Sequence, residues 1–172
     1  MLVFDLETNG LLNEVTCVHC LVIHDSESET TMVFNDQGSG VDSIVRGVQL
    51  LEDADIIVGH NVIGYDIPVL EKLYPWFEPK ALVIDTLLLS RLYHADQYNF
   101  DKKNQVERMP QQLYGRHSLE SWGYRLKVYK GEYGKTADWS EWSEQMQDYC
   151  IQDVNVTCEL CKHFHPYLNG SS

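Results

Sequence analysis

The side chains of this chain best suited to chemistry are four carboxylates and one phenol, drawn from three distant segments. Asp5 and Glu7 follow an apolar run in MLVFDLET, Asp66 ends HNVIGYD, and Tyr149 and Asp153 lie in DYCIQDV. Carboxylate oxygens are the ligands that hard divalent cations such as Mg²⁺ prefer. Two such ions can hold the attacking and leaving oxygens of a phosphodiester. If folding brings these carboxylates together, the sequence predicts metal-dependent cleavage of nucleic acid.

The spacing within each segment agrees with a shared site. Asp5 and Glu7 are two residues apart at the carboxyl end of an expected strand, so both side chains point to one side. Tyr149 and Asp153 are four apart on an expected helix and share a face. Taken singly, each pair also has a structural interpretation, as a strand-end pair or an amphipathic-helix pair, and Asp66 as an acid at a helix N-terminus. The prediction of a metal site therefore depends on the three segments taken together.

Apolar alternation and short buried runs predict strands at residues 1–5, Glu14–His24, Thr30–Phe34, Ile56–Gly59 and Ala81–Ile84. Helical spacing and capping residues predict helices at Asp42–Glu52, Ile67–Tyr74, Thr86–Tyr93 after the cap Asp85, Ser118–Leu126, and from Asp138, with Glu141 completing a capping box, to about His163. The polar stretch Ala95–Gly115 is interpreted as a long loop, with a helical turn as an alternative within it, and 131–136 as a shorter loop. A meander followed by alternating helices and strands predicts an α/β domain with a central mixed sheet and helices on both faces.

Length and composition indicate one globular domain, placed at residues 1–168, with 169–172 as a flexible tail. The chain has 172 residues, 44% of them hydrophobic and 23% charged. Its formal net charge of −13 is unfavourable for coating a nucleic acid, because phosphate contacts normally come from Lys and Arg. We therefore expect weak binding over a short footprint.

The few cationic residues cluster in two stretches, which are Lys102, Lys103, Arg108 and Arg116, and then Arg125, Lys127, Lys130 and Lys135. Each of them could simply be solvated surface. The alternative is that the polar stretch 95–115 guides a nucleic-acid strand through Lys102, Lys103 and Arg108.

No secretory signal or membrane span is visible, and a cytoplasmic protein that does not act at a membrane is expected. The five cysteines suit a reducing compartment. The pairs Cys17/Cys20 and Cys158/Cys161 have zinc-like spacing. On a strand that spacing sends two thiols to opposite faces, and on an apolar helix it favours core, so no zinc site is expected.

The three acidic segments resemble the exonuclease motifs of the DEDD superfamily of 3′→5′ exonucleases, which have an RNase H-like (DnaQ-like) fold. The first motif is similar to Phe4–Thr8, and the second to His60-Asn61 followed by Tyr65-Asp66. In the third, Tyr149 occupies the position typical of the tyrosine branch (DEDDy), whereas the position of the histidine in the other branch holds Asp148. The tyrosine branch includes the proofreading domains of family A and B DNA polymerases and RNase D-type ribonucleases.

Further segments resemble the proofreading exonuclease domain of family A polymerases from short-tailed bacteriophages, and the likeness runs from Met1 to about Leu160. They are Asp85-Thr86-Leu87, Leu89–Leu92, His117–Glu120, Trp122–Leu126 and Lys130–Tyr133. The resemblance implies a 3′→5′ exonuclease, either free-standing or a polymerase domain, that acts on single-stranded DNA or frayed 3′ ends and releases nucleoside 5′-monophosphates. A replication protein is the implied partner.

By the same resemblance, Asp5, Glu7, Asp66 and Asp153 would hold two divalent ions, Mg²⁺ or Mn²⁺, and Tyr149 would orient the attacking water. Because a phenol has a pKa near 10, it is a poor base at neutral pH, and positioning is the role expected for Tyr149. Leu11 matches a leucine that wedges between the last two bases. The motif neighbours Thr8, His60, Asn61 and Tyr65 are further candidates for substrate contact.

Two other functions fit the same motifs. An RNase D-like exoribonuclease would use the same carboxylates, because the pocket details that sense a 2′-hydroxyl are not visible in the sequence. A catalytically inactive nucleic-acid-binding module would be favoured by loss of an acidic ligand, and all four are present.

Overall fold

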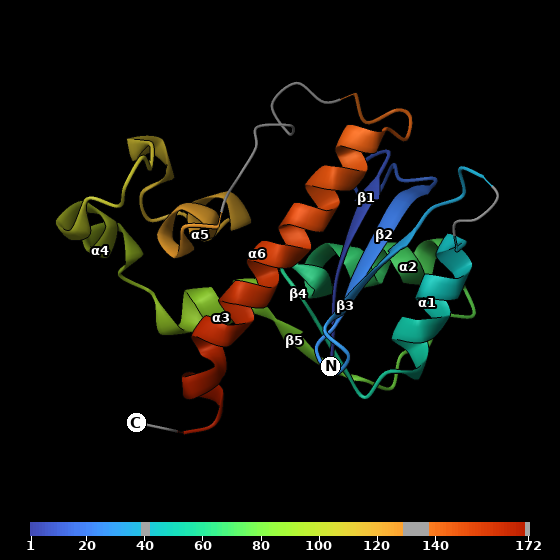
Figure 1. The fold of residues 1–172 in the computed structure, drawn as a ribbon, viewed down its shortest axis with the longest axis horizontal. Helices are drawn as coiled ribbons and strands as arrows, with labels where there is room; N and C mark the ends of the chain where they lie inside the picture. Colours follow the sequence, from blue (N-terminus) through green and yellow to red (C-terminus); the bar gives the residue numbers. More distant parts are fainter. Residues whose placement is uncertain (39–41, 129–137, 171–172) are drawn as a thin grey trace.

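The computed structural model describes residues 1–38, 42–128 and 138–170, and its centre is a mixed five-stranded sheet with the strand order β3-β2-β1-β4-β5. Helices cover both faces of this sheet (Figure 1). The predicted α/β class, with an antiparallel meander continued by parallel strands, is confirmed. Within the described residues, no helix combines the length and the apolar character that crossing a membrane would require.

The meander consists of β1 (Leu2–Thr8), β2 (Val18–Asp25) and β3 (Thr30–Phe34), paired antiparallel. The predicted start of the second strand at Glu14 is wrong, because residues 11–17 connect the strands and contain hydrogen-bonded turns, such as Glu14 N–H to Leu11 O at 2.9 Å. The β1–β2 register shifts between Glu7 and Thr8. Such bulges bend a strand and re-aim its side chains, and they are frequent beside active sites.

Strands β4 (Ile56–Gly59) and β5 (Leu82–Asp85) extend the sheet in parallel with β1. On one face of the sheet lie α1 (Ile44–Asp53) and α2 (Ile67–Leu73). Their apolar sides pack on the inward residues of the strands and form the largest buried cluster, which includes Phe4, Leu6, Leu21, Ile23, Phe34, Val48, Leu51, Ile57 and Leu70. This core fixes which side chains of β1 are left for the opposite face.

The long helix α6 (Glu144–Leu168) crosses the opposite face (Figure 1). It packs Cys150 and Val154 on Val3, Val22 and Val58 of the sheet. The predicted start at Asp138 is wrong. Asp138 accepts hydrogen bonds from Ser140 instead, and Ser143 caps the helix by accepting from Met146 N at 3.1 Å. The helix also continues beyond the predicted end at His163, with Pro166 in its last turn.

The remaining helices form a lobe beside α6, which we call the α4–α5 lobe and define as residues 97–126. It contains α4 (Gln97–Asn104), the short 3₁₀ helix η2 (Gln111–Leu113) and α5 (Leu119–Leu126), and α3 (Thr86–Tyr93) leads into it. The prediction of a long loop at 95–115 is therefore wrong. The predicted loop at 131–136 and the cations Lys130 and Lys135 lie outside the described residues.

A buried ion pair joins the two longer helices of this lobe. Asp101 of α4 accepts two hydrogen bonds from Arg125 of α5, at 2.9 and 2.7 Å. The side chains are 0% and 4% exposed, respectively. Asp101 also accepts from Gln97 and from Gly115 N. Because breaking such a pair leaves an uncompensated buried charge, the pair stabilises the helical form of a segment that has no amphipathic pattern.

Candidate functional site

Two of the predicted carboxylates reach the α6 face because side chains alternate along β1. Phe4 and Leu6 point into the core under α1 and α2. Asp5 and Glu7 therefore lie on the opposite face, the one on which α6 packs against Val3. Glu7 is 8% exposed and pairs across the sheet with Cys20 of β2.

Asp66 reaches the same place through an unusual turn after β4. Residues Val62–Asp66 form the π-helix η1, which continues directly into α2. Asn61, at its start, has a left-handed backbone with φ of 63°. Single-turn π-helices are rare and occur frequently at functional sites. Asp66 was expected to open a helix, and it is the last residue of η1 and the residue before α2.

The third segment confirms the predicted shared helical face. Tyr149 and Asp153 both lie on α6, one turn apart, and both are partly buried. The charge of Asp153 interacts with those of Asp5 and Glu7. Helix α6 thus brings a residue near the C-terminus against a strand at the N-terminus.

Electrostatics show that the four carboxylates share one environment. Burial, together with the charges of Asp5, Asp153 and Asp66, raises the pKa of Glu7 to about 11. Burial also raises the pKa of Asp66 to about 8, and the charge of Asp85 adds to this effect. The pKa values of Asp5 and Asp153 are likewise well above their ordinary range, through burial and then through charge repulsion. Without a counter-charge, the site holds protons that ordinary carboxylates release.

These residues fit a divalent cation. Oxygen Oδ2 of Asp66 is buried and has no hydrogen-bond partner, although Asp66 is only 5% exposed. A buried carboxylate oxygen without a partner is costly, and a cation would supply the missing interaction. The raised pKa values have the same implication, because a bound cation favours the ionised form of each group.

The substrate candidates beside the acids fall into two groups. Leu11 is 70% exposed and free to contact a base. Tyr65 instead donates a hydrogen bond from its hydroxyl to Gly10 O, and the same hydroxyl contacts the hydroxyl of Thr8. Thr8 and Tyr65 therefore connect the first acidic segment to the second. Their contact with substrate stays a prediction.

His60 bridges β4 to the segment before α5. Its two ring nitrogens lie 2.8 Å from Thr86 Oγ1 and from the main-chain oxygen of His117. Burial lowers its pKa to about 4, so the ring is neutral at physiological pH. A neutral ring engaged at both nitrogens positions its neighbours, and any contact of His60 with substrate stays a prediction.

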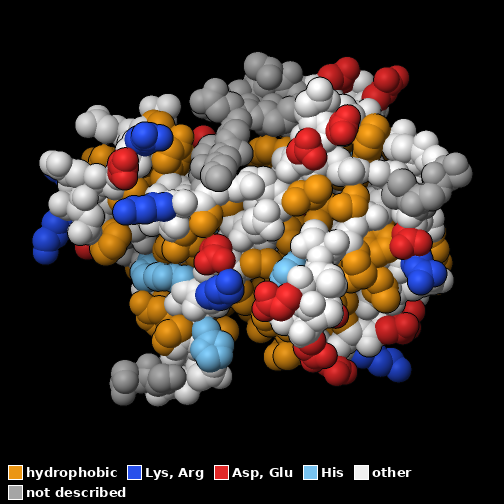
Figure 2. Space-filling model, viewed as in Figure 1, with side chains coloured by type: hydrophobic (Ala, Val, Ile, Leu, Met, Phe, Trp, Pro, Cys, Tyr) orange, Lys and Arg blue, Asp and Glu red, His pale blue; other side chains and the backbone are white. Residues whose placement is uncertain are grey.

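Next to His60 and Asn61, an open pocket of about 550 Å³ has a basic lining that the sequence did not single out as a site. It contains the exposed side chains of Arg91 and Arg116. Lys102 and Lys103 lie instead on the exposed surface of α4, and Arg108 follows that helix next to Glu107. Figure 2 shows several Lys and Arg side chains over the α4–α5 lobe, whereas most Asp and Glu side chains of this face lie elsewhere.

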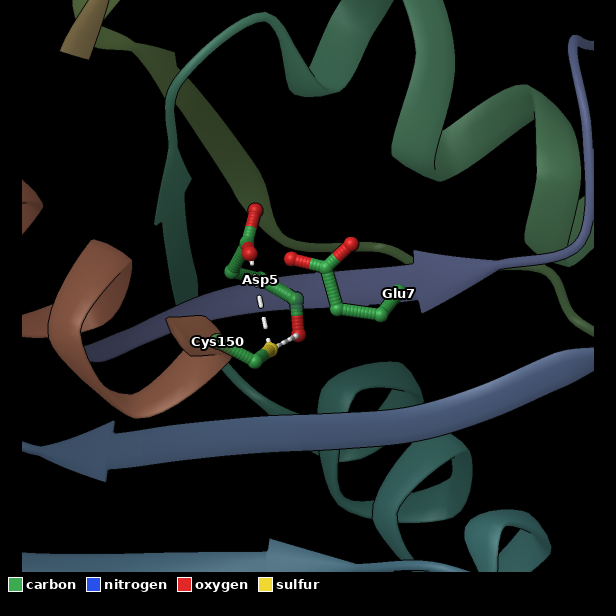
Figure 3. Close-up of side chains that lie close together, drawn as sticks. All are labelled: Asp5, Glu7 and Cys150. Atoms are coloured by element: carbon green, nitrogen blue, oxygen red, sulfur yellow. Dashed lines mark hydrogen bonds between the residues drawn. The ribbon is translucent and has the colours of Figure 1, made fainter. Parts of the chain in front are cut away.

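Cys150 is the residue at the acidic cluster that the sequence reasoning missed. Its Sγ lies 3.4 Å from the main-chain oxygen and 3.4 Å from Oδ2 of Asp5 (Figure 3). The available signal was its spacing, since Cys150 precedes Asp153 by three residues and so shares its helical face. Cys20, buried in β2, forms a hydrogen bond with Cys150 and so lies beside the cluster. The other three thiols differ: Cys17 is exposed and precedes β2, and Cys158 and Cys161 are partly buried on α6.

An α/β sheet of this order, with an acidic cluster at the C-terminal part of its first strand, defines a class of nucleic-acid enzymes. Residues 2–165 match the family model of the RNase_H superfamily, and the chain belongs to that superfamily. The chain is also 34% identical to the DNA-directed DNA polymerase of Escherichia phage T7, over 96% of its own length and 27% of the polymerase. The predicted resemblance to phage polymerases and the RNase H-like fold are thereby confirmed.

Solved structures of nucleases share the fold at low sequence identity. NrnC of Brucella melitensis with bound Mg²⁺ has a TM-score of 0.61 and 16% identity, over 99% of this chain and 75% of that one. The complex of E. coli ExoI with single-stranded DNA has a TM-score of 0.55 and 17% identity, over 98% of this chain and 41% of that one. The chain spans about a quarter of the length of the phage polymerase that it matches.

Proposed function

We propose that this chain is a metal-dependent 3′→5′ exonuclease that hydrolyses single-stranded DNA or frayed 3′ ends to nucleoside 5′-monophosphates. The observation that carries the proposal is the convergence of Asp5, Glu7, Asp66 and Asp153, whose charges raise one another's pKa values. Four buried or partly buried acids from three segments are costly without a bound cation. Similarity to a DNA-directed DNA polymerase favours DNA as the substrate and a replication protein as the partner.

The proposed cofactors are two divalent ions, Mg²⁺ or Mn²⁺, held by these four carboxylates. Bound there, they would lower the pKa of water and neutralise charge on the leaving oxygen. Structural likeness to NrnC with bound Mg²⁺ agrees with this assignment. The buried oxygen Oδ2 of Asp66, which has no hydrogen-bond partner, supports this proposal because it would be free to bind an ion.

The side chains of this chain would do the positioning. Tyr149, one helical turn before Asp153, would hold the attacking water by a hydrogen bond. Leu11, exposed beyond the end of β1, would contact the terminal base. Both residues lie close in sequence to ligands of the acidic cluster, Leu11 four residues after Glu7 and Tyr149 four before Asp153.

The strand leading to the 3′ end would run from the carboxylates across Asn61 into the basic pocket. Arg91 and Arg116 line that pocket and are exposed. They can neutralise phosphates, which the acidic remainder of the surface cannot do. Lys102, Lys103 and Arg108, farther out on the α4–α5 lobe, would meet a longer strand only.

The direct test uses single-stranded DNA labelled at its 5′ end, incubated with the protein and either Mg²⁺ or EDTA. We expect a ladder of labelled fragments shortened one nucleotide at a time with Mg²⁺, and intact substrate with EDTA. Asp66→Asn is the matched control and should be inactive at equal protein concentration. Activity in EDTA, an active Asp66→Asn variant or release of the 5′ label as the first product would contradict the proposal. Faster loss of a matched RNA strand would assign the enzyme to RNA instead.

A further inference from the structure

Cys150 places a buried sulfur among carboxylates proposed to bind hard cations. Its side chain extends from α6 under β1, towards the two acidic side chains drawn in Figure 3. The Sγ atom is 3.4 Å from Oδ2 of Asp5, a hydrogen-bond distance for sulfur. Residue Cys150 is 0% exposed. The thiol is therefore part of the site and is not merely near it.

The three ligand atoms have the spacing of a shared coordination sphere. One carboxylate oxygen of Asp5, one of Glu7 and the sulfur of Cys150 all lie within 4.8 Å of one another. An ion about 2.0 Å from an oxygen and about 2.3 Å from a sulfur, at tetrahedral angles, separates those atoms by about 3.5 Å. The distance of 3.4 Å between the sulfur and Asp5 Oδ2 is close to this separation, and the other pairs of ligand atoms lie within 4.8 Å.

A second observation also indicates an ion here. Oxygen Oδ2 of Asp66, whose charge acts on both Asp5 and Glu7, is buried and unpartnered. Asp66 could therefore supply a fourth ligand to an ion between the other three residues. Three oxygens and one sulfur form a donor set of mixed hardness, which differs from an all-carboxylate site.

We propose that Asp5, Glu7 and Cys150 form a site for a soft, thiophilic divalent cation of the Zn²⁺ or Cd²⁺ class, in competition with Mg²⁺ or Mn²⁺. The inference rests on the proposed function insofar as the carboxylates bind divalent cations. On binding, the S–H bond breaks, its proton passes to solvent, and the sulfur electron pair forms the bond to the cation. No oxidant or reductant is involved. Hard ions leave the thiol protonated as a donor to Asp5.

A regulatory consequence follows from the shared ligands. An ion held by Asp5, Glu7 and Cys150 occupies two carboxylates that hydrolysis requires, and closed tetrahedral sites leave no open position for water. Soft ions should therefore inhibit the enzyme. Replacing Cys150 by serine keeps a polar donor of similar size and removes the soft ligand. It should make the enzyme less sensitive to Zn²⁺, with inhibition expressed relative to the activity that the variant itself shows in Mg²⁺.

The test uses Cd²⁺ alone as the probe and X-ray absorption spectroscopy to identify its ligands. The protein carries serine at Cys17, Cys158 and Cys161, which lie outside the acidic cluster, so that Cys20 and Cys150 are the remaining thiols. We expect one sulfur in the coordination shell of Cd²⁺. Cys150→Ser should remove that sulfur, and the matched control Cys20→Ser, which replaces the buried thiol of the neighbouring strand, should retain it.

A coordination shell of oxygen and nitrogen only, in the protein with both thiols, would overturn the inference, and this result needs no variant of Cys150 to fold. Sulfur ligation that Cys20→Ser abolishes and Cys150→Ser preserves would overturn it as well. In the activity assay with Mg²⁺, Cys150→Ser should raise the inhibitory Zn²⁺ concentration by about 10-fold or more. An unchanged inhibitory concentration would contradict the inference.

The melting temperature in Mn²⁺ separates this inference from the proposed function. A protein that Mn²⁺ does not stabilise, yet that binds Cd²⁺ through sulfur, would contradict the proposed function and support the thiol site. A protein that Mn²⁺ stabilises, but whose bound Cd²⁺ has no sulfur ligand, would support the proposed function and contradict the thiol site.

Discussion

The carboxylate of Asp85, at the end of β5, accepts the backbone N–H of Asn61 at 2.9 Å and so fixes the left-handed turn that begins η1. Its other oxygen, Oδ2, accepts a hydrogen bond from Ile63 N at 3.0 Å. Oδ1, which accepts from Asn61 N, also caps α3 by accepting from Leu87 N at 2.9 Å. The end of strand β5 thus holds the start of η1, and the last residue of η1 is Asp66. A residue identified from sequence as a helix cap therefore also supports the acidic site.

Replacing Asp85 by alanine should weaken metal binding as well as stability. The loss of three backbone hydrogen bonds to a carboxylate is expected to lower the free energy of unfolding by about 2–4 kcal/mol. It should also lower the affinity for Mn²⁺ by about tenfold, because Asp66 loses its support. Urea denaturation and calorimetric titration measure the two effects.

Ser118→Ala is the control for a lost helix cap, because Ser118 caps α5. It should lower the free energy of unfolding by about 1 kcal/mol and leave the Mn²⁺ affinity unchanged. Equal Mn²⁺ affinities for folded Asp85→Ala and the unaltered chain would show that Asp85 acts on stability alone.

Tyr149 and Asp5 should differ strongly in their contribution to the rate. Tyr149→Phe removes one hydrogen bond to water and is expected to lower kcat by about tenfold. Asp5→Ala removes an ion ligand and should lower kcat by about a thousandfold. Hydrolysis of single-stranded DNA at saturating Mg²⁺ gives both values. If the two variants were equally inactive, Tyr149 would have a larger role than positioning.

Arg116 should contact a phosphate of the bound strand. Arg116→Ala is expected to weaken DNA binding several-fold and to reduce the slope of log affinity against log salt concentration by about 1. Titration of single-stranded DNA in Ca²⁺, which should bind and support little cleavage, measures this without hydrolysis. Arg46→Ala is the matched control, since Arg46 is exposed on α1, across the sheet from α6. Lys102→Ala should weaken the binding of longer DNA strands only. A salt dependence unaltered in Arg116→Ala would remove the basic pocket from the strand path.

Stability of the metal-free protein should fall as the pH rises. Asp66 has a pKa raised from 3.8 to about 8, and Glu7 from 4.5 to about 11. Above about pH 4 the folded protein therefore binds more protons than the unfolded chain, so the free energy of unfolding decreases with increasing pH. The contribution of Asp66 is fully present below pH 3.8 and is lost as the pH passes through about 8.

Above about pH 7, His60, whose pKa is lowered from 6.5 to about 4, is neutral in both states and does not oppose this trend. Between about pH 7 and about pH 9, thermal unfolding in EDTA should therefore show a melting temperature that decreases by about 5 °C or more. Saturating Mn²⁺ should flatten this dependence, because the ion favours the ionised carboxylates. Asp66→Asn should flatten it in EDTA as well. A melting temperature that rises with pH in EDTA would contradict the shared acidic environment.

Local signals in the sequence predicted much of this architecture. Alternation in β1 placed Asp5 and Glu7 on one face because Phe4 and Leu6 are strongly apolar and belong to the opposite face. Asp85 and Ser118 cap the helices expected of them, since a cap depends on residues two or three positions away. Interactions between residues so near in the sequence can be predicted from a single sequence.

The features that were missed depend on contacts between distant residues. Helix α4 has no apolar periodicity, and its buried Asp101 pairs with Arg125, 24 residues later, which a single sequence does not reveal. The left-handed Asn61 is likewise supported by Asp85 from another strand. The capping box expected at Asp138 does not form: Asp138 closes a turn of its own, and Ser143 caps the helix.

The central claim is that Asp5, Glu7, Asp66 and Asp153 surround a pair of divalent cations. Anomalous diffraction from a crystal soaked in Mn²⁺ tests it most directly, because manganese sites are located independently of any assumed ligands. The account predicts two manganese peaks among these carboxylates, with Asp5 bound to both ions and Asp66 Oδ2 bound to one. Carboxylates left without any manganese between them, at ion concentrations that saturate activity, would contradict it.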